Sequence, residues 1–193
     1  MPDTDAGAKL RAAVLELAAE RPVGQLSVTE LCRAAGVTRD SFYRFAAGPE
    51  ELLASAIVAE IDAPTPVDLT GLDLAQVGDV LFGGVRQFLG YVHRRSDVLR
   101  LAMAPQLSGP VRAVLVAQLE TGLRHYVRTH PEIVPALDGR ALSDDERAML
   151  IAQTANGSIG AIERWLALGM DDIDHGVRLI AMGSAGWWFG QPR

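Results

Sequence analysis

Polar side chains suited to binding nucleic acid gather in one short stretch of the sequence, residues 38–44. The guanidinium groups of Arg39 and Arg44 can each donate two hydrogen bonds to guanine, the commonest specific contact in the DNA major groove. Hydroxyl groups beside them can donate to phosphate, which fixes register without reading sequence. Asp40 would repel phosphate unless it accepts a hydrogen bond from a cytosine amine. The candidate contact residues are Thr29, Thr38, Arg39, Asp40, Ser41, Tyr43 and Arg44.

Two helix-start signals position these residues. Ser27 and Glu30 have the spacing of a capping box, in which each side chain bonds the backbone amide of the other residue. Gly36 ends this first short helix, and Thr38 then caps a second helix over residues 39–46. The sequence therefore predicts two short helices joined by a very tight turn.

Such a pair has the layout of a helix-turn-helix. Because the turn at Gly36-Val37 is too short for antiparallel helices, the two helices must cross steeply, which leaves the start of the second helix projecting from the surface. A helix end of this kind fits the major groove. The alternative is that residues 26–48 are a helical hairpin within a core, with the arginines solvated.

The composition offers little for other chemistries. The single cysteine, Cys32, cannot form an intramolecular disulfide, and the four histidines lack the spacing of metal ligands. We see no glycine-rich phosphate loop, nucleophile elbow or paired catalytic carboxylates. We therefore expect no enzyme activity, no metal and no cofactor.

Charge and hydropathy limit the partners and the location. The net charge of −6 argues against coating nucleic acid by charge alone, but residues 33–44 contain three arginines and one acid, so any DNA contact must be narrow and directed. Residues 1–9 lack the apolar core of a signal peptide, and no segment approaches the length of a membrane span. We expect a cytoplasmic protein that has no membrane partner.

The remaining sequence predicts an all-α fold. Apolar residues recur at three- and four-residue intervals, and no useful segment alternates as a half-buried strand would. A first helix is expected to end near Arg21-Pro22, and Pro64-Thr65-Pro66 breaks the fourth, which makes residues 64–73 the predicted joint between two modules. Later helices are expected to begin at Leu74, Ser96, Ser108, Ser143 and Asp171-Asp172.

The segment LSVTELCRAAGVTRDSFYRF (26–45), continuing to EELL (50–53), resembles the signature of the TetR family of transcriptional regulators. Residues 161–170 are similar to the end of that family's penultimate helix. The resemblance implies an N-terminal three-helix helix-turn-helix DNA-binding module (1–48), followed by a linking helix and a C-terminal ligand-binding and dimerisation module (49–193). It also implies a ligand-responsive regulator, more often a repressor than an activator, that binds a palindromic operator in double-stranded DNA as a homodimer and answers to a small-molecule effector.

The chain departs from the family pattern at four positions. Pro49 stands where a lysine aimed at phosphate is usual, Phe45-Ala46 where His-Phe is frequent, and Asp40 where glycine is frequent. Losing one phosphate contact lowers affinity without sequence bias, so we expect ordinary specificity with modest affinity. The rival interpretation is a TetR-like dimer that binds a ligand or a protein and has lost specific DNA binding.

Small and apolar residues mark the last two long helices as the dimer interface that the resemblance implies. A four-helix arrangement, two helices from each subunit, would bury them; an intramolecular helix pair is the alternative. The apolar Trp187-Trp188-Phe189 segment is expected to pack on the partner or to fold back. The candidate interface residues are Ala152, Ala155, Ile159, Ile162, Val177, Ile180 and Ser184.

The effector site is expected in the larger module. Gly83-Gly84 leaves space beside a helix, either for a pocket wall or for a neighbouring helix. A mostly apolar cavity with a few polar groups is the usual form of such a site. Effector binding is expected to shift the fourth helix and to change the separation of the two recognition helices. The candidate lining residues are Phe88, Tyr91, His93, Met103, His125 and Tyr126.

Overall fold

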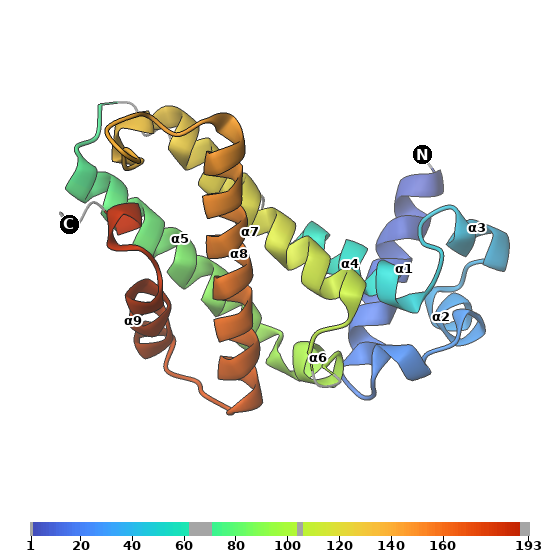
Figure 1. The fold of residues 1–193 in the computed structure, drawn as a ribbon. Helices are drawn as coiled ribbons and strands as arrows, with labels where there is room; N and C mark the ends of the chain where they lie inside the picture. The colour runs from blue at the N-terminus through green and yellow to red at the C-terminus, as the bar shows by residue number, and fades with distance from the viewer. Residues whose placement is uncertain (1, 62–70, 104–105, 190–193) are drawn as a thin grey trace. The chain divides into compact units, whose positions relative to one another are not determined.

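The computed structural model describes residues 2–61, 71–103 and 106–189, and it confirms the predicted all-α fold class (Figure 1). The described residues contain helices, isolated bridges and turns but no named strand. The helices are α1 (Pro2–Ala18), α2 (Val28–Ala35), α3 (Arg39–Tyr43), α4 (Pro49–Glu60), α5 (Leu74–Arg94), α6 (Ser96–Leu101), α7 (Gly109–Thr129), α8 (Asp144–Ala167) and α9 (Ile173–Gly183), with short 3₁₀ turns η1 (Val23–Gln25), η2 (Pro131–Ile133) and η3 (Gly186–Phe189).

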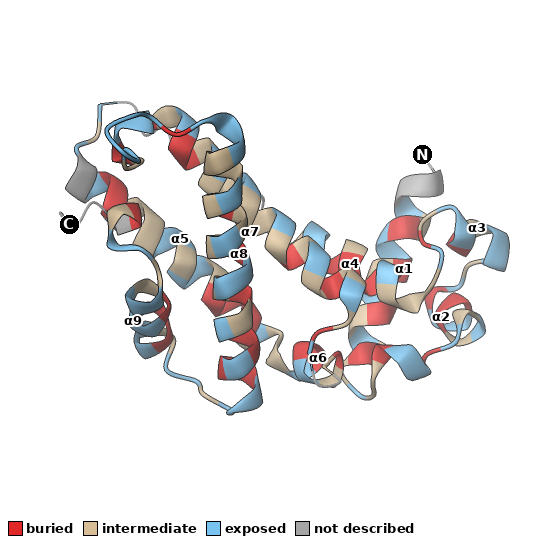
Figure 2. Ribbon diagram, viewed as in Figure 1, coloured by how far each residue is buried: buried red, intermediate tan, exposed pale blue. Residues whose placement is uncertain are grey.

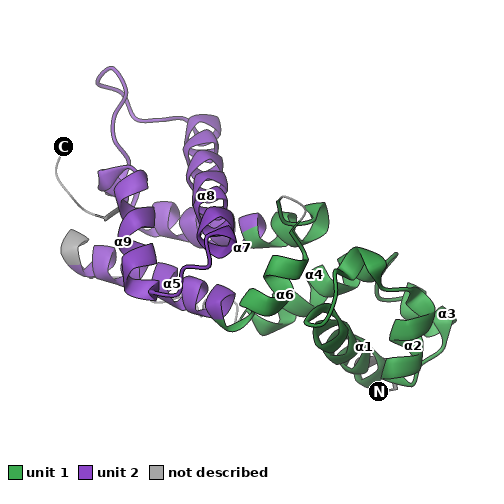
Figure 3. Cartoon of the chain, turned by 90° about the horizontal axis from the view of Figure 1, so that it is seen from below, with its two compact units in different colours: residues 1–62, 94–115 green, residues 63–93, 116–193 purple. Residues whose placement is uncertain are grey.

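The chain divides into two compact units (Figure 3). The N-terminal unit comprises Met1–Asp62 and Arg94–Leu115, and the C-terminal unit comprises Ala63–His93 and Val116–Arg193. Helix α6 therefore packs with the N-terminal helices although the chain reaches it through α5. The predicted joint at 64–73 falls mostly on residues 62–70, which lie outside the described residues. The functional boundary expected after residue 48 stays a prediction, while packing places α4 in the N-terminal unit.

In the N-terminal unit, α1 packs against α2 and α4 (Figure 1). Leu10 and Val14 of α1 are fully buried, as are Leu31, Phe42 and Leu53 from the helices around it. Burying side chains of this size stabilises the fold by roughly 1.5–3 kcal/mol each. Helix α1 ends at Ala18, earlier than the expected Arg21-Pro22, and a hydrogen-bonded turn fills the interval. The apolar stripe read from the sequence is thus the inner face of this unit.

The C-terminal unit is built from α5, α8, α9 and the part of α7 that follows Leu115, and the buried residues of these helices lie along their inner faces (Figure 2). The helix start predicted at Ser143 is present and is a capping box: the Ser143 hydroxyl accepts from the Glu146 amide, and the Glu146 carboxylate accepts from the Ser143 amide. Asp172 caps α9 by accepting from the His175 amide at 2.9 Å. A buried cluster joins α5, α7, α8 and the η2 and η3 turns; its members are Val77, Tyr126, Val127, Ile133, Ile151 and Trp188.

Helix α9 approaches α5 and α8 closely at Gly176. A Cβ atom built on this glycine would lie 2.6 Å from Leu89 Cδ2 and 3.1 Å from Trp165 Nε1. Since real Cβ atoms do not approach so closely, the absence of a side chain is what allows this contact. The lack of a side chain at Gly176 therefore lets α9 lie close to α5 and α8.

Two other features of the described residues bear on function. None of the helices in residues 2–61, 71–103 and 106–189 combines the length and apolarity that crossing a membrane requires. Within the same ranges, no three His, Cys, Asp or Glu side chains converge in a way that could hold a metal ion.

Candidate nucleic-acid interface

The turn between α2 and α3 is as tight as the sequence indicates. Gly36 takes the left-handed conformation with φ 65° and ψ 35°, which a residue with a side chain adopts only with strain. The amide of Val37 then donates to the Cys32 carbonyl at 3.0 Å, which closes the end of α2. Thr38 follows in an extended conformation, and its hydroxyl caps α3 by accepting from the Ser41 amide at 3.2 Å. The chain thus changes direction between α2 and α3 through Gly36, Val37 and Thr38.

The capping box at the start of α2 is also present. The Ser27 hydroxyl accepts from the Glu30 amide at 3.2 Å, and the Glu30 carboxylate accepts from the Ser27 amide at 2.9 Å. Arg21 adds a third partner, with Nη2 2.6 Å from Glu30 Oε1. The hydrogen bond from Arg21, followed by those from Ser27, lowers the pKa of Glu30 to about 2. These hydrogen bonds fix the start of α2, the first helix of the pair.

Helix α3 is shorter than expected, because it ends at Tyr43 and not near Ala46. The reason lies in the next helix. The Glu51 side chain of α4 accepts a hydrogen bond from the Ala47 amide at 2.8 Å, and Gly48 is extended with φ −166°. The chain therefore leaves helical geometry before α4 begins at Pro49.

The predicted contact residues of α3 face solvent. Thr38, Arg39, Asp40, Tyr43 and Arg44 are exposed, and Ser41 is half-buried. On the opposite side, Phe42 is fully buried and stands edge-on to the Tyr43 ring, with centroids 5.5 Å apart. Thr29, the predicted contact on α2, is exposed as well. The exposed side chains of residues 38–44 thus form a narrow polar ridge. The buried Phe42 packs into the core beneath it.

Hydrogen bonds order part of this ridge. The Thr38 hydroxyl donates to Ser41 Oγ at 3.2 Å, and Arg44 Nη2 donates to the same oxygen at 3.1 Å. Behind the ridge, burial raises the pKa of the Cys32 thiol, while the charge of Arg39 acts in the opposite direction. Cys32 is therefore a neutral core residue. The ridge is preorganised at Ser41, with two arginines and one carboxylate exposed around it.

At the start of α4 the departure from the family pattern is visible. Pro49 occupies the first helical position, where its missing amide hydrogen costs nothing, and Glu50 and Glu51 follow in the first turn. The acids suit the helix dipole but would not attract phosphate. Any cationic contact with DNA must therefore come from elsewhere in the unit.

The predicted dimer residues are mostly interior. Ala155, Ile159, Ile162 and Val177 are buried within the C-terminal unit, as is Ile180 at 8% exposure. Ala152 and Ser184 are half-buried. The interval of three and four residues identified the apolar stripe of each helix, and most of that stripe faces the protomer's own core. Ile180 and Ser184 also line a hollow between α8 and α9.

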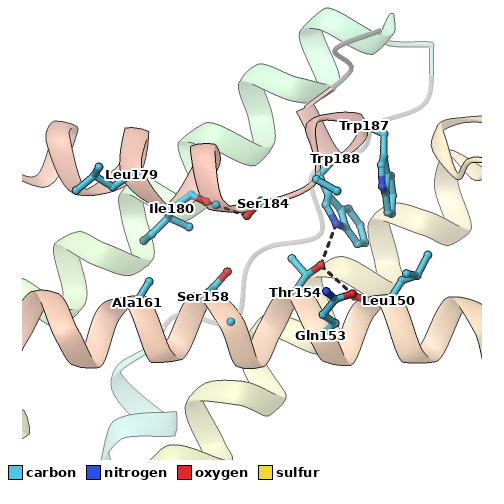
Figure 4. A pocket seen from close by; sticks show the side chains of 13 residues that line it. Leu150, Gln153, Thr154, Ser158, Ala161, Leu179, Ile180, Ser184, Trp187 and Trp188 are labelled. Atoms are coloured by element: carbon cyan, nitrogen blue, oxygen red, sulfur yellow. Dashed lines mark hydrogen bonds between the residues drawn. The ribbon is translucent and has the colours of Figure 1, made fainter. Parts of the chain in front are cut away.

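Several large apolar side chains of this region are exposed. Met182 and Leu179 of α9 are 82% and 44% exposed, Met149 of α8 is 67% exposed, and Leu168, the residue after α8, is 60% exposed. Between α8 and α9 lies a hollow of about 230 Å³. Figure 4 shows Thr154, Ser158 and Ala161 along its α8 side, Leu179, Ile180 and Ser184 along α9, and the indoles of Trp187 and Trp188 at one end. We call the residues that line this hollow, together with the exposed Met182, the α8/α9 face.

The candidate effector residues do not line this hollow. Tyr91 and Tyr126 are buried, Phe88 and His125 are half-buried in the C-terminal unit, and Met103 belongs to the N-terminal unit. His93 stands edge-on to Trp165, with ring centroids 6.0 Å apart. Gly83 and Gly84 are exposed, and a Cβ atom on either would meet nothing within 4 Å, so no helix of the described residues fills that space.

Tyr126 has a structural partner. Its hydroxyl donates to the Trp188 carbonyl at 3.0 Å, and burial, with a smaller contribution from Glu132, raises the pKa of Tyr126 to about 12. Trp188 Nε1 in turn donates to Thr154 Oγ1 at 2.9 Å. The C-terminal tryptophan segment therefore folds back onto its own unit, one of the two arrangements expected. Sequence reasoning missed the hollow beside it, although the tryptophan pair was a visible signal.

Comparisons with known proteins identify the fold. No family model matches the sequence, and no curated protein matches it. Among solved structures, the dihydroxyacetone kinase operon activator DhaS superposes with a TM-score of 0.59 at 14% identity, over 92% of each chain. A TetR transcriptional regulator from Rhodococcus sp. RHA1 gives 0.53 at 15% identity, over 94% of this chain and 98% of that one. At these identities the likeness concerns the fold, and this chain has the fold of a TetR transcriptional regulator.

Proposed function

We propose that this protein is a ligand-responsive transcription regulator, a repressor, that binds a palindromic operator in double-stranded DNA as a homodimer. The observation that carries the proposal is the exposed polar ridge of α3, with Arg39 and Arg44 facing solvent in front of the buried Phe42. A capped helix end of this size enters the major groove, where arginine reads guanine. The domain assignment follows: residues 1–48 contact DNA, and residues 49–193 bind the effector and pair the subunits.

Binding to DNA is tested with duplexes from the region upstream of the protein's own gene. Fluorescence anisotropy at several salt concentrations should give saturable binding that weakens as salt rises, because phosphate contacts release counterions. Arg39→Ala and Arg44→Ala should each weaken specific binding by roughly fivefold to a hundredfold, the usual worth of a bidentate base contact. Arg128→Ala, which removes an exposed arginine from α7, is the matched control and should change affinity little.

The same experiment can contradict the DNA-binding proposal. If the protein prefers no sequence over random DNA at low salt, and neither α3 substitution changes the affinity, the DNA-binding proposal is wrong. The second candidate function, a TetR-like dimer that binds only a ligand or a protein, would then stand. Pro49 and the two acids after it favour that candidate, since they remove a cationic phosphate contact at the start of α4.

The homodimer is proposed on the α8/α9 face. One recognition helix reads only a half-site, so two copies must stand about 34–36 Å apart along the DNA. A two-fold interface requires the same surface to complement itself. Met182 protrudes on α9 beside the hollow lined by small residues of α8, and a surface with a protrusion next to a depression meets that requirement. Exposed side chains of this size also favour burial against a partner.

The effector response is proposed to pass through the end of α4. Arg95, at the start of α6, donates from Nε to Glu60 Oε2 at 2.7 Å and from Nη2 to Glu60 Oε1. This two-point contact joins the last turn of α4 to α6 within the N-terminal unit. A ligand that displaces α6 would therefore move α4. Spin labels on α3 of each subunit should report a changed distance when an effector releases DNA, and an unchanged distance would contradict the route.

The direction of regulation is tested separately. A reporter gene placed behind the bound upstream sequence should be expressed less when the protein is present, and expression should recover with Arg39→Ala. Higher expression with the wild-type protein would instead make it an activator, as the name of DhaS says of that protein.

A further inference from the structure

Asp40 is an unusual residue to find on a ridge that contacts DNA. We propose that the Asp40 carboxylate reads a cytosine base in the major groove and so determines which operator sequence the protein prefers. The inference rests on the proposed DNA-binding function and adds the base that the interface selects. It concerns the side chain alone, because α3 is too short to act through its dipole.

The position of Asp40 supports a direct role. It is the second residue of α3 and is exposed, and within the described part of the chain its side chain makes no hydrogen bond or ion pair. Residues three and four positions apart share one face of a helix, so Asp40 shares its face with Tyr43 and Arg44. Buried Phe42 points the other way. The carboxylate therefore belongs to the group of side chains that would meet the DNA.

Nothing in the ridge neutralises this carboxylate. Arg44 has the i, i+4 spacing that suits an ion pair with Asp40, yet its Nη2 donates to Ser41 Oγ. An unpaired carboxylate facing phosphate would be repelled, and one buried without a donor would lose its hydration without compensation. Asp40 can therefore enter a DNA interface favourably only where a base supplies a hydrogen-bond donor.

The choice of base follows from the pattern of the groove edges. In the major groove only the N4 amine of cytosine and the N6 amine of adenine donate. Adenine places the N7 acceptor beside its amine, which repels a carboxylate, whereas cytosine has no acceptor there. The guanine paired with that cytosine presents O6 and N7, acceptors that an arginine can bind. Arg44, which shares the face of Asp40, is the arginine of α3 whose position suits the other half of one C·G pair.

The test begins with selection of duplexes from a randomised pool by the wild-type dimer. Each half-site of the selected operator should contain an invariant cytosine. Changing that cytosine to thymine, whose O4 is an acceptor, should weaken wild-type binding by roughly tenfold to a hundredfold at fixed salt. With Asp40→Ala the same base change should alter affinity by less than about twofold, because the contact that distinguishes the bases has been removed.

Asp40→Asn makes the prediction sharper. An amide both accepts and donates, and it pairs with the N6 and N7 atoms of adenine. This variant should therefore select adenine where the wild type selects cytosine. Glu16→Gln is the matched control, since it removes one exposed acid from α1 in the same unit; it should leave the selected sequence unchanged.

Two results would overturn the inference while leaving the proposed function intact. In the first, Asp40→Ala binds every duplex more tightly by one common factor and keeps the wild-type base preference, which would make Asp40 a source of general repulsion. In the second, the selected operator has no invariant cytosine. A wild-type protein that selects no sequence at all would instead remove the proposed function, and this inference with it.

Discussion

The hydroxyl of Tyr126 donates a hydrogen bond to the backbone carbonyl of Trp188, 62 residues further along the chain, at 3.0 Å. The rings of these two residues also lie near each other, with centroids 6.1 Å apart, and Trp187 stacks on Trp188 at 4.1 Å. This contact joins α7 to the η3 turn inside the cluster that closes the C-terminal unit. It makes Trp188 part of the core.

Removing Trp188 should therefore destabilise the protein strongly. Trp188→Ala deletes a side chain that is 2% exposed and leaves Thr154 without its donor, so the free energy of unfolding should fall by about 3–5 kcal/mol. Tyr126→Phe should cost about 1 kcal/mol, because it removes one hydrogen bond and little packing. Urea unfolding followed by circular dichroism measures both. Trp187→Ala, at a half-buried position, is the control and should cost less than Trp188→Ala.

Gly176→Ala should weaken the attachment of α9. The new methyl group would stand 2.6 Å from Leu89 Cδ2, so side chains of α5 and α8 must shift, at a cost of roughly 1–3 kcal/mol. Gly122→Ala in the middle of α7 is the matched control. Its new methyl would meet nothing within 4 Å, and alanine favours the helix by up to about 1 kcal/mol. Thermal unfolding should therefore move in opposite directions for the two variants; a stable Gly176→Ala protein would contradict the close approach.

Acid should loosen the starts of α2 and α8. The pKa of Glu30 is lowered from 4.5 to about 2, first by the hydrogen bond from Arg21, and that of Glu146 is lowered to about 2, first by the hydrogen bond from Arg140. A carboxyl group whose pKa is lower in the folded state stabilises that state above its ordinary pKa. This contribution is lost as the pH falls from about 4.5 to about 2.

The measurement is the helical circular dichroism signal as a function of pH. Glu30→Gln and Glu146→Gln should each make the protein less stable at neutral pH and flatten its response between pH 4.5 and pH 2. Glu16→Gln, at an exposed position on α1, should reproduce the wild-type profile. Profiles of the Glu30 and Glu146 variants that match the wild type would show that these capping boxes do not contribute.

Met182→Glu should separate the subunits and leave each one folded. Its side chain is 82% exposed in the protomer, so a charge there does not disturb the core, but in the proposed interface it would be buried without a partner. Analytical ultracentrifugation should show a shift from dimer to monomer with unchanged helix content. Leu137→Glu replaces another exposed apolar residue, outside α8 and α9, and should remain dimeric. A dimeric Met182→Glu protein would move the interface elsewhere.

Helix starts were predictable from the sequence because a cap is a local interaction. Ser27, Thr38, Ser143 and Asp172 all accept the backbone hydrogen bonds expected of them. Helix ends were less predictable, since they depend on the residues that follow. Helix α3 ends at Tyr43, and shortly after it the Ala47 amide donates a hydrogen bond to the Glu51 side chain of α4. The exposed ridge of α3 follows from the same local signals, and for that reason its residues could be named in advance.

The faces of α8 show where sequence reasoning stops. Ile159 and Met149 are both large and apolar, and both lie on the same helix, yet one is fully buried and the other is 67% exposed. A repeat of three and four residues identifies a stripe but does not say whether a helix with apolar residues on two sides turns a given side inward. The hollow beside Trp188 likewise depends on a contact between residues far apart in the chain. The tryptophan pair signals that an apolar contact exists, but the local sequence does not say which residues form it.

The position of the indole side chains has a practical consequence. All three tryptophans, Trp165, Trp187 and Trp188, belong to the C-terminal unit, while Tyr43 stands on the ridge of α3. Indole emission therefore reports on the C-terminal unit alone, and Trp187 and Trp188 border the hollow of the α8/α9 face. Unlabelled wild-type protein consequently contains its own optical probe for screening small molecules, and a change in emission on mixing would locate the response in the C-terminal unit without any engineered dye.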